Sequence, residues 1–153
     1  MDRRNAIKSI AVAGAAAALP KFSAAEVGKK SQLKVGLVGC SGRGIGAVEN
    51  MLQAANGSVK IVAIADLFAD RNDLAIKAFE RYSKKFGKDT IDVPTSRRFS
   101  GWDAYKQILG EDIDIIIHAT PPVFRPLHIR EFVKAGKHLF VEKPACVDPV
   151  RSR

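Results

Sequence analysis

The segment Lys34–Gly44, KVGLVGCSGRG, constrains the fold of this chain more than any other stretch. It begins as an apolar run, which predicts a short buried strand. Gly39, Gly42 and Gly44 follow, and they predict a tight turn into a helix. The first N–H groups of a helix have no partner within it and lie at the positive end of its dipole, so this turn is a candidate site for a diphosphate.

The spacing of these glycines resembles the G-x-G-x-x-G dinucleotide fingerprint, with one departure. Ser41 stands where the second glycine is expected, so its Cβ approaches the diphosphate while its hydroxyl offers a donor. We expect cofactor binding that is weaker but retained. The residues expected at the cofactor in this loop are Gly39, Ser41, Gly42, Arg43 and Gly44.

The rest of the chain alternates apolar runs with segments of helical periodicity. Strands are expected at 34–38, 59–65, 92–95, 113–119 and 138–141, and helices at 44–54, 70–86, 102–109 and 126–135. This alternation predicts an α/β fold, a doubly wound parallel sheet of the Rossmann type. We expect the sheet to stop after its fifth strand.

Three regions are predicted along the chain: an export signal at 1–25, a linker at 26–33 and the dinucleotide-binding domain at 34–153. The first region places Arg3-Arg4 before an alanine-rich apolar run and then small residues, which is the order of a secretory signal and resembles a twin-arginine signal. Asp2 and Ala6 depart from that motif. The run is too short for a stable membrane span. We expect a periplasmic protein, or a cytoplasmic one if the signal does not function; an N-terminal anchor or a disordered tail is the alternative.

Charge and composition bear on nucleic-acid binding, on disulfide bonds and on metal binding. The formal charge is +9, but the basic residues are scattered and carry few interleaved aromatics, so nucleic-acid binding is not expected. Cys40 and Cys146 are the only cysteines, and we expect two free thiols. No metal site is predicted, and the oligomeric state is left open.

Asp66 closes the second predicted strand, 22 positions after Gly44. A carboxylate at about this distance accepts hydrogen bonds from the adenosine ribose in Rossmann domains and repels a 2′-phosphate. NAD is therefore expected, and NADP is less favoured, although Arg71 can pair with a 2′-phosphate. The alternative role of Asp66 is to cap the following helix.

Two further motifs follow predicted strands, at the edge where open α/β sheets bind ligands. Thr120 and Pro121 begin a rigid loop that suits a wall for the nicotinamide ribose. Glu142, Lys143 and Pro144 follow the last strand, and proline restricts Lys143 to extended geometry that would aim its ammonium into the crevice. A strand-ending turn and a solvated surface lysine are the alternatives.

Taken together, VGLVGCSGRG, VAIAD, HATPP and HIREFVKAGKHLFVEKP resemble the glucose–fructose oxidoreductase / inositol 2-dehydrogenase (Gfo/Idh/MocA) family. The resemblance runs from about Lys34 to Pro149. It implies NAD(P) in the crevice, Glu142 at the cofactor, Lys143 as catalytic residue, and sugars, polyols or related compounds as substrates. Two positions are open for His128, which lies in the helix after the Pro-Pro loop: at the site or on the helix surface.

The resemblance also implies a C-terminal substrate domain, which we do not expect within these 153 residues. We therefore expect an NAD(P)-binding domain of a CH–OH oxidoreductase that is not catalytic by itself, with a sugar-like substrate bound only if a second domain is supplied. A non-catalytic nucleotide-binding module, or an inactive truncated product, is the alternative.

Overall fold

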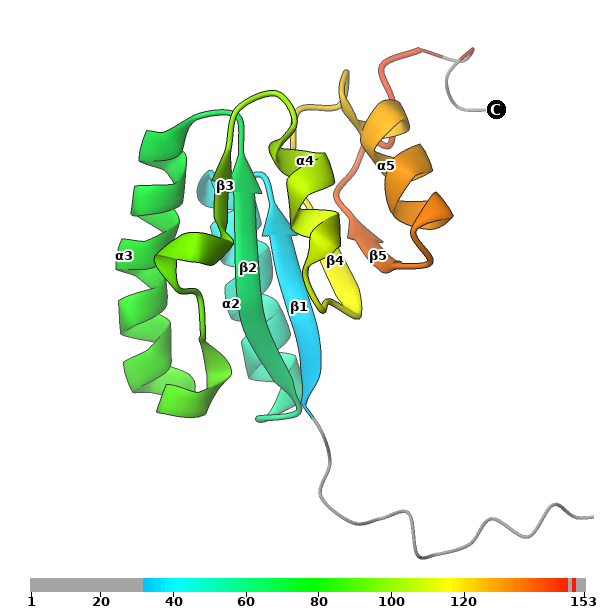
Figure 1. Ribbon diagram of the computed structural model, residues 1–153. Coiled ribbons are helices and arrows are strands. Elements are labelled where there is room, and N and C mark those ends of the chain that lie inside the picture. The colour runs from blue at the N-terminus through cyan, green and yellow to red at the C-terminus, as the bar shows by residue number, and fades with distance from the viewer. Residues whose placement is uncertain (1–31, 149, 151–153) are drawn as a thin grey trace, which may run out of the picture. The chain divides into compact units, whose positions relative to one another are not determined.

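The computed structural model describes residues 32–148 and 150 (Figure 1). They form a five-stranded parallel sheet with the strand order β3-β2-β1-β4-β5. The strands are β1 (Leu33–Val38), β2 (Val59–Asp66), β3 (Arg98–Ser100), β4 (Ile115–His118) and β5 (His138–Val141). This order confirms the predicted doubly wound sheet. The predicted export signal and residues 26–31 of the predicted linker lie outside the described residues.

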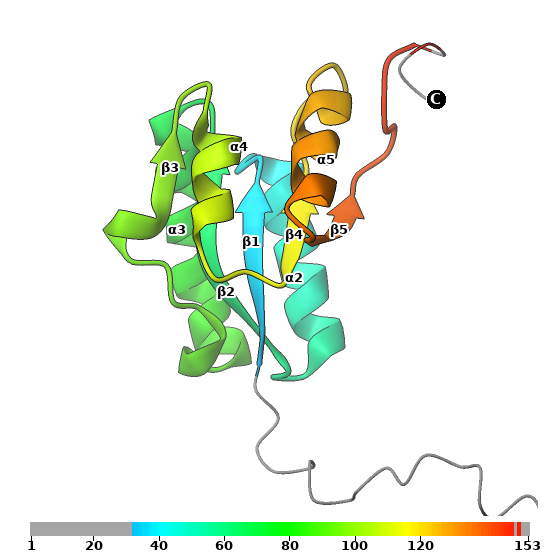
Figure 2. The same cartoon turned by 45° about the vertical axis from the view of Figure 1, so that its right-hand side comes forward.

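Helices cover both faces of the sheet, as Figures 1 and 2 show. They are α2 (Gly42–Ala55), α3 (Ala69–Phe86), α4 (Ala104–Gln107) and α5 (Arg125–Lys134). The apolar faces of α2 and α3 pack with one side of the strands into one core cluster. Side chains of α4 and α5 pack against the other side into a second cluster, so both faces of the central strands are buried.

The central position of β1 follows from its composition. Val35 and Leu37 are fully buried, and β1 pairs with β2 on one side and with β4 on the other. All three strands run in the same direction, so the loops that leave them meet at one edge of the sheet.

No helix in the described part of the chain is long and apolar enough to cross a membrane.

The third strand differs from its predicted position at 92–95. Ile91 forms only an isolated bridge with Ile61, and a 3₁₀ turn, η3 (Thr95–Arg97), follows Pro94. Proline has no N–H to donate to a ladder, which stops pairing there. The strand pairs later, at β3, whose three residues are too few to show an alternating pattern.

The helix predicted at 102–109 is shorter than expected, because α4 passes into a 3₁₀ turn, η4 (Ile108–Gly110).

The turn from β1 into α2 brings the helix backbone close to the end of the strand. Gly39 has a φ of 98°, a conformation that favours glycine. A Cβ placed on Gly44 would lie 1.9 Å from the carbonyl oxygen of Gly39. Helix α2 therefore packs directly on the strand end that precedes it. Cys40, in the same turn, is a buried free thiol, and Cys146 is also free, as expected.

This contact predicts a sharp difference between two glycines of one helix. We expect Gly44→Ala to lose about 3 kcal/mol of unfolding free energy or more, because its methyl group meets backbone that cannot give way. Gly46 faces open space, so Gly46→Ala should gain about 0.5–1 kcal/mol from helix propensity. Urea unfolding of both variants measures the difference, and equal stabilities would contradict the packing described here.

Candidate cofactor-binding site

A cavity of about 320 Å³ opens at the carboxyl edge of the sheet. Its walls come from the ends of β1, β2 and β4 and from the first turns of α4 and α5. The predicted site residues that line it are Gly39, Ser41, Asp66, Thr120 and Pro121. The structure thus brings together three sequence motifs that lie up to 82 positions apart. The predicted residues Gly42, Arg43, Gly44, Glu142 and Lys143 do not line this cavity.

The Asp66 carboxylate is held by two backbone amides. The N–H of Cys40 donates to Oδ2 at 2.7 Å, and the N–H of Phe68 donates to Oδ1 at 3.0 Å. The N-cap of α3 is Phe68, so the alternative that Asp66 occupies that position is wrong. An ionised carboxylate offers about four acceptor positions. Each oxygen of Asp66 therefore retains capacity for one further donor on the cavity side.

Helix α2 presents its N-terminus at the same edge. Ser41 is its N-cap residue, with extended backbone and no hydrogen bond from its side chain to the helix. The first turn of α2 carries no acidic side chain that would neutralise the dipole. The exposed Ser41 hydroxyl and the first helical amides are thus available to an anion.

Arg43 and Glu142 form an ion pair that joins the first turn of α2 to the loop after β5. The Glu142 side chain is buried, and its hydrogen bond with Arg43 lowers the pKa of that carboxyl. The same bond raises the pKa of Arg43. These two predicted cofactor contacts are paired with each other in the structure, across 99 positions of sequence.

Arg125 ties together the two loops that follow β4 and β5. Its Nε donates to the carbonyl oxygen of Thr120 at 2.7 Å, and its guanidinium also donates to the carbonyl oxygens of Glu142 and Pro144. Arg125 is only 5% exposed, and burial lowers the pKa of its guanidinium. A planar fork with several donors is what such bridging requires, so one side chain fixes both loops at the sheet edge.

Lys143 lies on the loop that Arg125 holds. The loop backbone is anchored by the N–H of Glu142, which donates to the carbonyl oxygen of His118 at 3.0 Å. The Lys143 side chain is exposed, and the peptide bond between Lys143 and Pro144 is cis. The structure therefore places Lys143 at the sheet edge but outside the cavity that Asp66 lines.

Two histidines lie where β4 meets α5. His118, at the end of β4, is fully buried, and its Nε2 is 3.2 Å from Nδ1 of His128. His128 lines the cavity. Burial lowers the pKa of His118 to about 3, and the nearby His128 and Arg125 act in the same direction. Burial also lowers the pKa of His128 to about 4, so both rings are neutral at neutral pH.

Comparison with known proteins places this architecture in a family. Residues 33–152 match the Gfo/Idh/MocA profile, described as the oxidoreductase family with an NAD-binding Rossmann fold. The chain belongs to this family. The predicted resemblance and the predicted Rossmann domain are thereby confirmed.

Several curated proteins are similar to this chain in sequence. Glycosyl hydrolase family 109 protein 2 of Shewanella sp. strain ANA-3 is 31% identical, over 94% of this chain and 33% of its own length. A glycosyl hydrolase family 109 protein of Solibacter usitatus is 28% identical, over 94% of this chain and 33% of its own. The chain thus spans about a third of the length of these curated relatives.

Solved structures share the fold. A scyllo-inositol dehydrogenase from Lactobacillus casei, solved with NAD(H) and scyllo-inositol, gives a TM-score of 0.56 at 22% identity, over 78% of this chain and 30% of its own. A 3-ketoreductase from Actinomadura kijaniata, solved with NADP and TDP-benzene, gives 0.52 at 24% identity, over 79% of this chain and 32% of its own.

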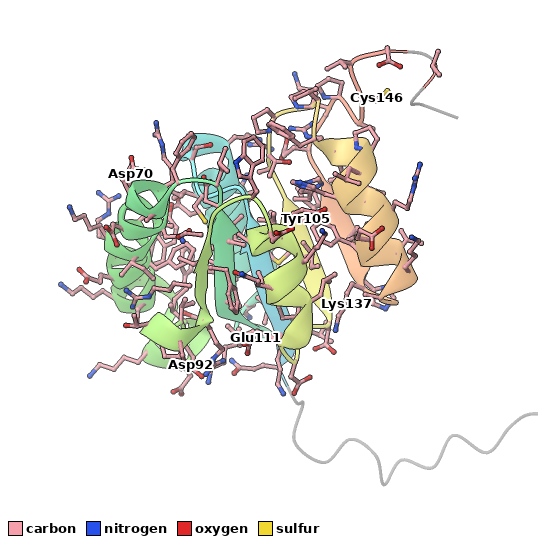
Figure 3. All side chains as sticks on the ribbon, turned by 45° about the horizontal axis from the view of Figure 1, so that its top comes forward. Asp70, Asp92, Tyr105, Glu111, Lys137 and Cys146 are labelled. Atoms are coloured by element: carbon pink, nitrogen blue, oxygen red, sulfur yellow. The ribbon has the colours of Figure 1, made fainter. Side chains whose placement is uncertain are left out.

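Three residues that shape the site of this Gfo/Idh/MocA domain were not predicted as site residues from the sequence. Arg125 was not singled out, since a lone arginine before proline carries no motif. His118 opens the HATPP motif, but only Thr120 and Pro121 of that motif were assigned to the site. Tyr105 was also missed; its ring stacks on His128 with centroids 3.9 Å apart, and Figure 3 shows it between α4 and α5. Each acts through contacts between distant segments, which no local pattern displays.

The buried Arg125 predicts a large stability effect. We expect Arg125→Met to lose about 3 kcal/mol of unfolding free energy, because three carbonyl oxygens lose the charged donor that they share. Arg125→Lys should lose less unfolding free energy than Arg125→Met but more than none, since one ammonium cannot donate to both loops as a planar guanidinium does. Chemical denaturation tests this, with exposed Arg130→Met, on the same helix, expected within about 0.5 kcal/mol of wild type.

The neutral histidines predict an acid-sensitive fold. The folded-state pKa of His118 lies below the ordinary value of about 6.5, so the unfolded chain binds a proton that the folded chain excludes. Stability therefore increases with pH across this window and is lost as pH falls from about 6.5 towards about 3. The slope reaches about 1.4 kcal/mol per pH unit for one such group, and His128 adds to it.

Thermal unfolding at pH 7, 6 and 5 measures this slope. The hydrogen bond with Arg43 lowers the pKa of the Glu142 carboxyl, which moves its titration in the folded chain away from that range. We expect His118→Leu to reduce the slope and His138→Gln, at an exposed position, to leave it unchanged. A His118→Leu slope equal to that of wild type would show that His118 is not the buried neutral group.

Proposed function

We propose that this domain binds NAD in the cavity at the carboxyl edge of the sheet. The adenosine ribose would lie on Asp66, and the diphosphate would lie at the N-terminus of α2 beside Ser41. Family membership supports a nicotinamide dinucleotide, and neighbours of the same fold were solved with NAD and with NADP. Their shared fold supports a cofactor site at this edge of the sheet. We infer the preference between NAD and NADP from the residues of this chain.

The observation that carries the proposal is the carboxylate of Asp66. Backbone amides hold it at the cavity wall by one bond to each oxygen. Two acceptor positions remain, which matches the two hydroxyls of an unphosphorylated ribose. A 2′-phosphate would replace one hydroxyl by a dianion beside a carboxylate, so we infer that NAD binds more tightly than NADP.

The reaction we propose for this domain together with a substrate domain is oxidoreduction of a sugar or polyol. NAD, when bound, accepts a hydride from a carbon that carries a hydroxyl. On the chain itself, Arg125 and the Arg43–Glu142 pair hold the loop that carries Lys143. The exposed ammonium of Lys143 would hydrogen-bond that hydroxyl and help move its proton. Covering this open edge would exclude water from the substrate.

The names of the relatives favour a second candidate function. Several are called glycosyl hydrolase family 109 proteins, so cleavage of a glycosidic bond competes with net oxidation. A mixture of NAD, a p-nitrophenyl glycoside and this domain supplied with a substrate domain separates these functions, with free sugars tested in parallel. Nitrophenol release without NADH accumulation favours hydrolysis, and NADH formation from free sugars favours oxidoreduction. If NAD binds and neither signal is observed, the result favours a non-catalytic nucleotide-binding module.

The binding proposal predicts a specific change at Asp66. In calorimetric titrations of the full chain we expect saturable binding of NAD, and weaker binding of NADP. Asp66→Asn removes the charge that repels a 2′-phosphate, so the NAD-to-NADP preference should fall about tenfold, worth about 1.4 kcal/mol. Asp73→Asn, at an exposed position on α3 outside the cavity lining, is the matched control. Tighter NADP binding by the wild type would overturn the assignment of Asp66.

A further inference from the structure

The hydrogen bonds around His118 leave one of its nitrogens without a partner. Nε2 of His118 lies 2.8 Å from Oγ1 of Thr120 and 3.2 Å from Nδ1 of His128. Nδ1 of His118 is buried and has no hydrogen-bond partner among the described residues. A neutral imidazole carries one proton, so this arrangement restricts where that proton lies.

Two tautomers of His118 are possible, and the surroundings favour one. A proton on Nδ1 would bury an N–H donor with no acceptor, and Nε2 would have a single lone pair for two neighbours. A proton on Nε2 leaves only a lone pair unpaired, and one N–H can be shared between Thr120 and His128. Buried donors without acceptors are the rarer defect, so the Nε2–H tautomer fits better.

This tautomer determines the proton of the neighbouring ring. Nδ1 of His128 then accepts from His118, so the neutral His128 carries its proton on Nε2. Within the described part of the chain, His128 Nε2 has no hydrogen bond, and it is not among the fully buried unpartnered atoms. Because His128 lines the cavity, its Nε2–H is an accessible donor there.

The walls around this donor are aromatic. Tyr105 stacks on the His128 ring at an interplanar angle of 16°, and Phe124 lies nearly parallel to it at 6.1 Å. Phe68 and the exposed Trp102 also line the cavity. Flat aromatic walls beside a neutral donor suit a planar heterocycle that has ring-nitrogen acceptors, since such a ring can stack and accept a hydrogen bond.

We propose that His128 is a specificity residue that donates its Nε2–H to a ring nitrogen of the purine base, and that His118 is a positioning residue that holds this tautomer. The inference rests on the proposed NAD site, because Asp66 lines the same cavity and the base is attached directly to the ribose that Asp66 would bind. The chemical class recognised is a purine nucleotide, and adenine carries the required acceptors at N1, N3 and N7.

Nitrogen NMR of the imidazoles tests the tautomer directly on the full chain labelled with ¹⁵N-histidine. We expect pyrrole-type Nε2 and pyridine-type Nδ1 signals for both His118 and His128 at pH 7. Addition of NAD should shift the Nε2 signal of His128 and leave the exposed His138 unchanged. A protonated Nδ1 on either buried histidine, or an unmoved His128 signal in the NAD-saturated chain, would overturn the inference.

Ligand titrations test the role in recognition. His128→Phe keeps an aromatic wall but removes the donor, so NAD and ADP-ribose should bind about five- to tenfold more weakly. Nicotinamide mononucleotide, which lacks the purine, should bind as it does to wild type. His118→Leu should weaken NAD binding similarly, and His118→Gln, which restores an N–H at that end, should recover most of it; His138→Gln is the control.

The outcomes separate this inference from the proposed function. If the wild type binds no NAD, the proposed function fails and this inference falls with it. If the wild type binds NAD and His128→Phe binds it equally well, only this inference is wrong. If the substituted chains do not fold, the imidazole spectra of the wild type still decide the matter, because they need no variant.

Discussion

The close approach of helix α2 to the end of β1 is the constraint on which the rest of the site depends. Gly44 packs on the carbonyl of Gly39 at a distance that admits no side chain. This contact places the free amides of α2 at the carboxyl edge, and it leaves the N–H of Cys40 facing the Asp66 carboxylate. The acceptor predicted for the ribose and the amides predicted for the diphosphate are therefore positioned by one turn.

A second level of organisation comes from buried charge. Arg125 crosslinks the loops after β4 and β5, and Arg43 pairs with Glu142 across the same edge. Buried ionic groups of this kind contribute less to net stability than their number suggests, since desolvation offsets much of the attraction. Their effect is on geometry: three loops that leave different strands are held in one arrangement before any ligand arrives.

Much of the fold could be predicted because its signals are local. Apolar runs predicted β1, β2, β4 and β5 close to their observed positions. β3 was misplaced, because three half-exposed residues carry no periodicity and their pairing depends on β2. Asp66 and Thr120 were found at the cavity through their motif positions. Arg125 and His118 were not, since their roles exist only after distant segments pack.

The contrast between Asp66 and Arg71 underlies the cofactor preference that we propose for this cavity. Asp66 is held by backbone amides, so its charge cannot move away from a ribose. Arg71 lines the same cavity, but its ion pair with Asp70 is long, at 3.8 Å, and exposed to solvent. Such a pair contributes little, which leaves the guanidinium free to turn towards a phosphate. We therefore propose that the fixed carboxylate of Asp66 favours NAD, while the exposed guanidinium of Arg71 limits how strongly NADP is rejected.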